Sequence, residues 1–548
     1  MTTPGDELLF LALGGSDEIG MNVNLYGAQG KWIMVDLGLT FAGGDYPGVE
    51  LILPDLEFIE DRKKDLLGIV LTHGHEDHIG AIPYLAADLG VPLYASPFTA
   101  TLIKRKLEDE GIAADVDLRI IPMEGSFELG VFKCKFVTLA HSIPEMSAVE
   151  IETPYGRIFH TGDWKLDEEP VLGTPTTAAA LTAMGDKGVL AMVCDSTNAF
   201  NNEASGSEGS VYADLLKSVK EAKGRVLVTS FASNGARMQT LANVAKEAKR
   251  KLCFAGRSID KIVSAAQANG YLKKLPEMVS WDNIDTFKRN EVMIVATGGQ
   301  GEARAALARI AEGTHPIKLE EGDTVIFSSK QIPGNEVAIG RVMNQLAKRN
   351  ILTVTEKQVH IHVSGHPGKP ELEAMYSWIR PQMLIPVHGE RRHMAEQARF
   401  GLSKGIPKSV VQSNGDVVRL APNGPKIIGK ERTGRLVLDG DEIVPADGVT
   451  MNERRRISVN GHISVAVSAV GSKNAVKDIE VRLQGVPVEG EDREAFIEEA
   501  IFAIREASQK PFGDREKLRE AVRLAARRTA NEWTGKKPIV DVMILSAE

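Results

Sequence analysis

A short segment rich in histidine and carboxylate side chains carries the clearest chemistry in this chain. The segment His73-Gly74-His75-Glu76-Asp77-His78 follows an apolar run at residues 68–72. A strand that ends in such a turn can direct these donors to one point, and imidazole with carboxylate suits zinc better than calcium or magnesium. His73 and His75 can share one ion, while Asp77 and His78 point to a neighbouring position. The spacing predicts two ions, which at roughly 3.5–4 Å separation can hold hydroxide against a phosphoryl centre.

Three further polar residues follow apolar, strand-like runs later in the chain. They are His141, after residues 136–140, Asp163, in the turn after residue 159, and His388, after residues 384–387. Each is delivered into a turn, which is how the edge of a sheet builds a metal site. The histidine-rich segment alone could be a chance cluster or a single structural site. The presence of all these residues together favours a metal centre.

Length and composition describe an ordinary globular protein of several domains. The chain has 548 residues, of which 43% are hydrophobic and 25% charged, so two or three domains are expected. Its three cysteines, Cys134, Cys194 and Cys253, lie far apart in apolar runs and are interpreted as buried thiols in a reducing compartment. No stretch reaches the roughly 18 apolar residues that a membrane span needs. We therefore expect a cytoplasmic protein with no membrane partner.

The net charge of −9 is modest evidence against broad binding of duplex nucleic acid. A narrow groove lined by Lys and Arg beside divalent ions can still bind phosphates on an acidic protein. The charge therefore remains compatible with a single strand that enters a local basic channel.

The spacing of apolar runs predicts an inserted domain. Residues from about 7 to 200 alternate short strands with Gly-containing turns, which is typical of a sheet sandwich covered by helices. Between about 206 and 355, strand-like runs alternate with helical stretches, which indicates a parallel, doubly wound sheet. Because His388 follows this block, the block is inserted into the metal domain. Residues 424–460 are polar and Gly-rich, typical of a connecting or edge segment. The rest of the chain is predicted to be a small α/β module.

The motifs resemble those of a known group of nucleases. The histidine-rich segment, with His141, Asp163 and His388, resembles the metal motifs of the metallo-β-lactamase fold. Asp195, His366 and His388 resemble the three additional motifs of the β-CASP nucleases. Four further segments are similar to bacterial ribonuclease J: residues 14–22, 36–39, 47–50 and 297–302. The pairs Ser16-Asp17 and Gly43-Gly44 depart from that pattern, but they lie in predicted loops, so they put loop geometry in doubt and not the chemistry.

The resemblance implies an α/β architecture in three parts. A metallo-β-lactamase αββα sandwich, residues 1–205 and 357–430, would contain an inserted doubly wound β-CASP domain at residues 206–356. A linker at 431–460 and a small C-terminal α/β domain at 461–548 would follow. The match covers the chain from near its start to about residue 430.

The ligands can be divided between two zinc ions, with manganese as an alternative. His73, His75 and His141 would hold one ion, and Asp77, His78 and His388 the other, with Asp163 between them. Asp36 is expected to order the metal loop. The resemblance gives His366 the role of general acid, supported by Asp195, because a carboxylate raises the pKa of an imidazole and fixes its tautomer. The alternative is that His366 only binds phosphate.

Substrate-binding residues are predicted in two places. His362 and Ser364 would share a strand face with His366 and contact substrate phosphates. The turn at residues 230–237 lies between a strand and a helix in the inserted domain, where backbone N–H groups favour an anion. There, Ser230, Ser233 and Asn234 are predicted to bind a 5′-monophosphate. The alternative for this turn is an ordinary helix N-cap without a ligand.

These features predict a ribonuclease that hydrolyses single-stranded RNA with two metal ions. The resemblance implies a 5′-to-3′ exonuclease that prefers 5′-monophosphate ends and has some endonuclease activity, in RNA maturation and decay. It also implies a homo-oligomer, dimer or tetramer, formed through the C-terminal domain. The alternatives are a β-CASP DNA nuclease, a small-ester metallo-hydrolase, and an RNA-processing scaffold without catalysis. The complete ligand set argues against the scaffold, and the long insertion argues against the small-molecule hydrolase.

Overall fold

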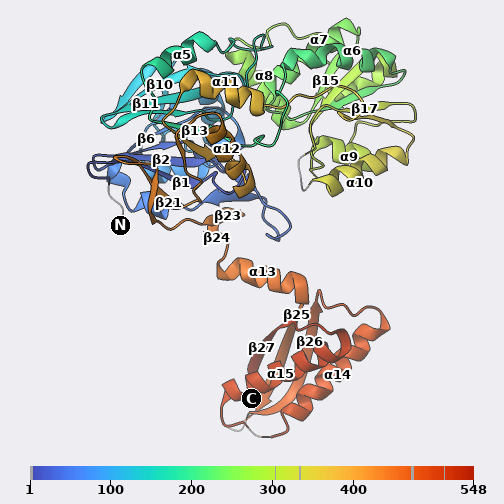
Figure 1. Ribbon diagram of the computed structural model, residues 1–548. Helices are drawn as coiled ribbons and strands as arrows, with labels where there is room; N and C mark the ends of the chain where they lie inside the picture. Colours follow the sequence, from blue (N-terminus) through green and yellow to red (C-terminus); the bar gives the residue numbers. More distant parts are fainter. Residues whose placement is uncertain (1–3, 303, 332–334, 471–473, 511, 548) are drawn as a thin grey trace. The chain divides into compact units, whose positions relative to one another are not determined.

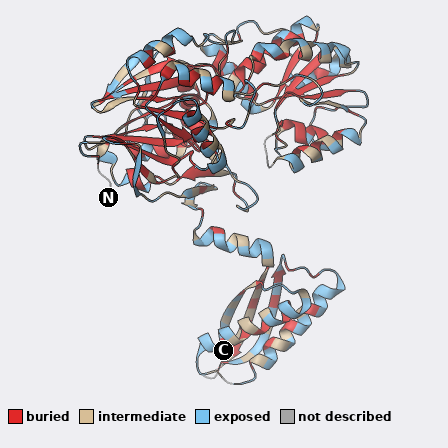
Figure 2. Ribbon diagram, viewed as in Figure 1, coloured by how far each residue is buried: buried red, intermediate tan, exposed pale blue. Residues whose placement is uncertain are grey.

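The computed structural model describes residues 4–302, 304–331, 335–470, 474–510 and 512–547. The chain forms two compact units. The first contains residues 1–40 and 53–433, and the second contains residues 41–52 and 434–548. Figure 1 shows the elements in sequence colours, and Figure 2 shows that buried residues concentrate in the sheets.

The first unit contains a sandwich of two mixed sheets. The eight-stranded sheet has the order β22-β21-β1-β2-β3-β6-β7-β8, and the seven-stranded sheet has the order β20-β19-β13-β12-β11-β10-β9. The strands of the first sheet are β1 (Leu8–Gly14), β2 (Val23–Ala28), β3 (Lys31–Val35), β6 (Leu66–Val70), β7 (Leu93–Ala95), β8 (Leu118–Ile120), β21 (Asp416–Ala421) and β22 (Lys426–Lys430). Those of the second are β9 (Ser126–Leu129), β10 (Phe132–Thr138), β11 (Ser147–Thr153), β12 (Gly156–His160), β13 (Ala191–Asp195), β19 (Met383–Val387) and β20 (Lys408–Ser409).

One apolar core fills the space between these sheets. It joins Phe10 and Val35 of the first sheet to Phe136, Val193 and Ile385 of the second. Helices α5 and α11 cover the other face of the second sheet, where they share a second core with β13 and β19. The helices of this domain are α1 (Glu57–Glu60), α2 (Glu76–Ile79), α3 (Ile82–Leu89), α4 (Pro97–Asp109), α5 (Ala178–Asp186), α11 (Lys369–Ile379) and α12 (Arg391–Ser403), with a short 3-10 turn at Lys63–Asp65.

The inserted block folds as a doubly wound sheet, as its periodicity predicted. The strand order is β15-β16-β14-β17-β18, and each strand runs parallel to its neighbours. The strands are β14 (Val226–Thr229), β15 (Lys251–Ala255), β16 (Val292–Ala296), β17 (Thr324–Phe327) and β18 (Leu352–Val354), and the helices are α6 (Tyr212–Glu221), α7 (Gly235–Glu247), α8 (Arg257–Ala268), α9 (Ala306–Glu312) and α10 (Glu336–Ala347). All five residues of β16 are buried. A parallel strand covered on both faces requires such a continuous apolar run.

Polar contacts join the inserted domain to the sandwich between α4 and α8. The Nδ2 group of Asn269 donates to Thr101 Oγ1 at 2.9 Å, and Arg105 donates to Ser264 Oγ at 2.8 Å. Close by, the Tyr271 hydroxyl donates to Glu145 at 3.1 Å. Six residues thus tie the two domains through three side-chain hydrogen bonds.

The second unit contains two small sheets. Strands β24 (Glu442–Pro445), β23 (Arg435–Asp439), β5 (Leu51–Pro54) and β4 (Thr40–Phe41) form one of them, in that order. Helix α13 (Val449–Asn460) precedes the sheet of β26 (Ala475–Gln484), β25 (His462–Val470) and β27 (Ile539–Ala547). Helices α14 (Glu491–Ala507) and α15 (Arg515–Thr534) share a core with this sheet. The segment at 431–460, which we expected to be a linker, therefore contains β23, β24 and α13.

Candidate active site

The loop after β6 is held in place by a buried carboxylate. Asp36 follows β3 with a φ of 66°, in the left-handed region. Its side chain accepts hydrogen bonds from the Thr72 backbone N–H at 2.8 Å and from the Thr72 hydroxyl at 2.9 Å, and it lies 2.7 Å from Nδ1 of His78. With Nδ1 of His78 directed at Asp36, Nε2 is the nitrogen that could bind a cation, in place of its present contact with Asn22 Nδ2 at 3.1 Å. Asp36 therefore orders the loop, as the sequence predicted.

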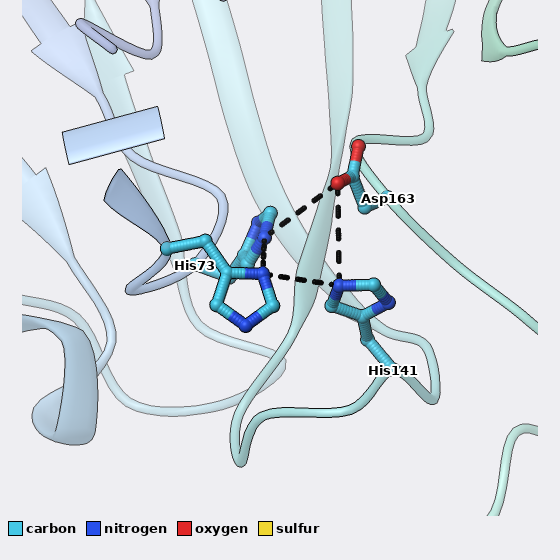
Figure 3. A group of neighbouring side chains, drawn as sticks. His73, His141 and Asp163 are labelled. Atoms are coloured by element: carbon cyan, nitrogen blue, oxygen red, sulfur yellow. Dashed lines mark hydrogen bonds and ion pairs between the residues drawn. The ribbon is translucent and has the colours of Figure 1, made fainter. Parts of the chain in front are cut away.

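The first group of donors gathers three imidazoles and one carboxylate. Donor atoms of His73, His75, His141 and Asp163 all lie within 4.8 Å of one another. Nδ1 of His75 lies 3.0 Å from Nε2 of His73 and 3.2 Å from Nε2 of His141. Figure 3 shows the Asp163 carboxylate in contact with the rings of both His73 and His141, at 3.9 and 4.0 Å from their Nε2 atoms. Three ring nitrogens at these separations form a donor set that fits a divalent cation.

A second group shares Asp163 with the first. It contains Asp77, His78, Asp163 and His388. Nε2 of His78 lies 3.2 Å from Asp163 Oδ2, and Nε2 of His388 lies 3.1 Å from Asp77 Oδ2. The structure thus brings together all seven residues that the sequence singled out as ligands, in two groups with Asp163 in common.

The electrostatics of both groups favour bound cations. Burial acts to raise the pKa of the Asp163 carboxyl, but His388 and His78 lower it overall, so the group is ionised at neutral pH. Burial lowers the pKa of His75 to about 4, which leaves a neutral ring. Burial also acts to lower the pKa of His388, but Asp163 and the other carboxylates raise it to about 10. Carboxylates that favour a proton on this imidazole also favour a divalent cation in the same place.

Unsatisfied buried atoms support the same conclusion. Among the described residues, Oδ1 of Asp163 is buried and has no hydrogen-bond partner, and neither has Nε2 of His75, the ring nitrogen outside the donor group. Buried polar groups in native proteins nearly always have a partner. The donor set, its charge and these atoms all fit a metal centre.

A candidate acid–base pair, His366 and Asp195, lies beside the donor groups. Nδ1 of His366 lies 2.8 Å from Asp195 Oδ2, at the end of β13. The rings of His366 and His388 are stacked, with centroids 5.6 Å apart. Burial acts to lower the pKa of His366, but the Asp195 carboxylate raises it overall. An imidazole that retains its proton near neutral pH can act as a general acid.

Two neighbouring residues that sequence reasoning missed fix this pair. The Thr197 hydroxyl lies 2.7 Å from Asp195 Oδ1 and 2.9 Å from Nδ1 of His388, so it connects the two sites. Nδ2 of Asn198 donates to Ser364 Oγ at 2.8 Å and to the His366 carbonyl at 3.0 Å. Their position in the turn directly after Asp195 is the signal that could have identified them.

The strand expected around His362 and Ser364 is absent. Residues 360–368 are described but form no regular element. Ser364 accepts from Asn198 and from the His366 backbone N–H, so it belongs to the network around the candidate acid–base pair. Ile361 and Val363 are buried, so the alternation of polar and apolar residues is present. The Ile361 carbonyl accepts from the side chains of Arg237 and Ser328 in the inserted domain and not from a partner strand.

The carboxyl end of the inserted sheet contains further buried donors. Within the part of the chain that the structure describes, Thr229 Oγ1, Ser230 Oγ, Arg237 Nη2 and His362 Nδ1 are buried without a hydrogen-bond partner. Burial and the charge of nearby Arg237 together lower the pKa of His362 to about 3. Asn234 caps α7, since its Oδ1 accepts from the Arg237 backbone N–H at 2.8 Å. The structure thus adds Thr229 and Arg237 to the substrate-binding residues that were predicted from the sequence in this region.

Comparisons with known proteins identify the family. Four family models match in succession: "Metallo-beta-lactamase superfamily" at residues 18–192, "Ribonuclease J, beta-CASP domain" at 223–346, "Zn-dependent metallo-hydrolase RNA specificity domain" at 352–408 and "Ribonuclease J C-terminal domain" at 449–547. Ribonuclease J of Sinorhizobium meliloti is 40% identical over 98% of this chain and 97% of its own length. The chain belongs to the ribonuclease J family. Ribonuclease J 1 of Streptococcus pyogenes is 34% identical over 99% of this chain and 98% of its own length.

Family membership confirms the fold and the class of activity. The protein is a metal-dependent ribonuclease with a metallo-β-lactamase domain, a β-CASP insertion and a ribonuclease J C-terminal domain. A solved structure of a protein of unknown function from Enterococcus faecalis V583 has a TM-score of 0.53 and 17% identity, over 75% of this chain and 100% of the other, which is a likeness of fold alone. No helix within the described ranges is long and apolar enough to cross a membrane.

Proposed function

We propose that this ribonuclease J hydrolyses single-stranded RNA with two metal ions, as a 5′-to-3′ exonuclease that prefers 5′-monophosphate ends and also cleaves internally. The observation that carries the proposal is the pair of donor groups that share Asp163, with His366 and Asp195 beside them. We further propose a cytoplasmic role in RNA maturation and decay.

The proposed cofactors are two zinc ions, or manganese in their place. His73, His75 and His141 would hold one ion, Asp77, His78 and His388 the other, with Asp163 offered to both. When bound, such ions supply hydroxide at neutral pH and neutralise charge on the phosphate. A histidine-rich set favours zinc, whereas the two carboxylates keep manganese possible.

His366 is the proposed proton donor to the leaving ribose oxygen. The Asp195 carboxylate keeps the ring protonated and holds Nδ1, so that Nε2 is the nitrogen left to donate. Thr197 binds the other oxygen of Asp195 at 2.7 Å and so keeps the carboxylate turned toward His366. The chain thus supplies the acid and the two residues that orient it.

The preference for a 5′-monophosphate is assigned to the carboxyl end of the inserted sheet. The proposed ligands are Ser230, Ser233, Asn234, His362 and Ser364, as predicted from the sequence. The four unpartnered buried donors at Thr229, Ser230, Arg237 and His362 support an anion there, because a phosphate would satisfy several of them at once. Of these proposed ligands, Ser364 differs from the others because its hydroxyl already accepts a hydrogen bond from Asn198.

The test compares one single-stranded RNA with 5′-monophosphate, 5′-hydroxyl and 5′-triphosphate ends, and the corresponding DNA. Labels at the 5′ or 3′ end separate exonuclease from endonuclease products. The proposal expects mononucleotides released first from the 5′-monophosphate RNA, and a Ser230→Ala variant that loses the preference. Equal rates on all three RNAs would overturn the preference, and faster cleavage of DNA would favour the alternative of a DNA nuclease.

We also propose a homo-oligomer, dimer or tetramer, formed through the C-terminal domain. Met543 and Leu545 of β27 are 54% and 59% exposed, while Val540 on the same strand is buried in the domain core. An exposed apolar row on a sheet is a site for association. A Met543→Asp variant should have a lower solution mass by light scattering, and a Phe502→Asp control on α14 should not. We retain the predicted domain limits, with residues 206–356 as the insertion, except that residues 431–460 contain β23, β24 and α13 and are not a simple linker.

A further inference from the structure

An exposed aromatic ring lies close to the catalytic residues and has no role in the chemistry described so far. Phe200 is 49% exposed, although it is a large apolar side chain. Its ring forms an edge contact with His393, with centroids 5.5 Å apart. Among the described residues, this is one of two ring contacts between a histidine and an exposed aromatic side chain, the other being Trp281 with His315.

The fold places this pair at the edge of the sheet that carries the active site. Strands β13 and β19 are parallel neighbours, and Asp195 lies opposite Val387. Phe200 lies in the turn that follows Asp195 at the end of β13, and His393 lies in the first turn of α12, five residues after His388. The two rings therefore follow, within five residues each, the proposed partner of the general acid and a proposed metal ligand.

The surroundings of the pair combine apolar and cationic groups. Ile19 is 43% exposed, and the preceding residue, Glu18, forms a bridge with Gly389 in the His388 loop. Arg391 and Arg392 precede His393 on α12; their side chains are 57% and 62% exposed and form ion pairs with Asp17 at 3.6 Å and Glu390 at 2.7 Å. An exposed ring flanked by arginines is the combination with which proteins bind single-stranded nucleic acid, because the ring stacks on a base and the cations attract the phosphates.

We propose that Phe200, supported by His393, is a binding subsite for one nucleobase of the RNA, within two nucleotides of the bond that is cleaved. The inference rests on the proposed hydrolysis of single-stranded RNA, which brings unpaired bases to this edge. Every base has an apolar face, so the subsite contributes affinity without sequence preference. Its role is to hold the strand in register with the donor groups, and His393 fixes the ring of Phe200 from the side.

The first experiment removes single bases from the substrate. A 5′-monophosphorylated RNA is made with one abasic nucleotide at each of the first six positions in turn. In the wild type, an abasic nucleotide at one position near the cleaved bond should lower kcat/KM by about tenfold. Phe200→Ala should lower kcat/KM on the intact RNA by a similar factor and should lose the sensitivity at that position. The abasic profile is the dependence of kcat/KM on the position of the abasic nucleotide. If wild type and Phe200→Ala had the same profile, the inference would be overturned.

Matched variants separate stacking from a general apolar contact. Phe200→Tyr keeps a ring and should behave as wild type, whereas Phe200→Leu keeps apolar area without a ring and should behave as Phe200→Ala. Trp281→Ala, which removes the other exposed ring that contacts a histidine, should leave the abasic profile unchanged. Wild-type behaviour of Phe200→Leu would overturn stacking.

A second readout does not depend on turnover. The fluorescent base 2-aminopurine is placed at the sensitive position, and its quenching is followed by rapid mixing before cleavage. Wild type and Phe200→Tyr should quench it, and Phe200→Ala should not. Failure of the proposed function would appear as a wild type that leaves intact RNA uncleaved. An active wild type without any quenching difference between these proteins would instead overturn this inference alone.

Discussion

Asp195 and His366 are joined by a contact of 2.8 Å between Oδ2 and Nδ1, across 171 residues of sequence. The whole inserted sheet lies between them in the chain. The carboxylate ends β13, and the histidine lies in the irregular segment that returns from the insertion. Assembly of this proposed catalytic pair therefore depends on the correct folding of the β-CASP domain.

The pH dependence of catalysis should reveal this pair. Burial acts to lower the pKa of His366, and the Asp195 carboxylate raises it overall, so the acid form persists to higher pH. Asp195→Asn removes the charge, and the pKa of His366 should fall. Because a general acid works only while protonated, the alkaline fall in kcat/KM should begin at lower pH in this variant. An alkaline limb that stays in place would show that His366 is not the acid.

Removal of the shared carboxylate should disrupt both metal sites. Asp163 is the one residue common to the two donor groups. Asp163→Ala should lower the number of metal equivalents measured by elemental analysis and abolish RNA cleavage, as should His75→Ala for its own group. His462→Ala, a histidine of the C-terminal domain, is the control and should retain both. Full metal content with full activity in Asp163→Ala would contradict the assignment.

Thr197 offers a test of orientation without a change of charge. Its hydroxyl contacts Asp195 and His388 at 2.7 and 2.9 Å. Thr197→Val keeps the shape of the side chain and removes both hydrogen bonds. We therefore expect the activation barrier to rise by about 1–3 kcal/mol, which lowers the rate roughly 5- to 150-fold. Thr197→Ser should recover most of the activity. Equal activity of the Val and Ser variants would mean that the hydroxyl does not orient the pair.

A methyl group at Gly38 should displace a metal ligand. A Cβ atom at this position would collide with the backbone carbonyl of Asp77, which also accepts from the Asn22 N–H at 2.8 Å. Backbone atoms cannot move aside as a flexible side chain can. Gly38→Ala should lose metal and activity, whereas Gly43→Ala, where a Cβ would meet nothing within 4 Å, should keep both. Intact metal binding in Gly38→Ala would contradict this reading of the loop.

The sequence by itself determined the parts of the site that depend on local order. The pattern of apolar residues was enough to predict the strands of the inserted sheet. A parallel strand that is buried on both faces must be apolar throughout, as β16 is. The segment from His73 to His78 predicted two ions because its donors are only a few residues apart. The family resemblance added Asp195 and His366 as a pair. The same local reasoning failed at residues 360–368, where alternating burial arises without a paired strand.

Only the tertiary structure decided which distant residues meet. Asp77 and His388 lie 3.1 Å apart across 311 residues, and Thr197 connects His388 to Asp195. The contact of Phe200 with His393 and the gathering of unpartnered donors at Thr229, Arg237 and His362 have no pattern in the sequence. Such contacts depend on the register of β13 with β19 and on the return of the chain from the insertion. Register is set by packing across the whole sheet, so no local spacing of residues encodes it.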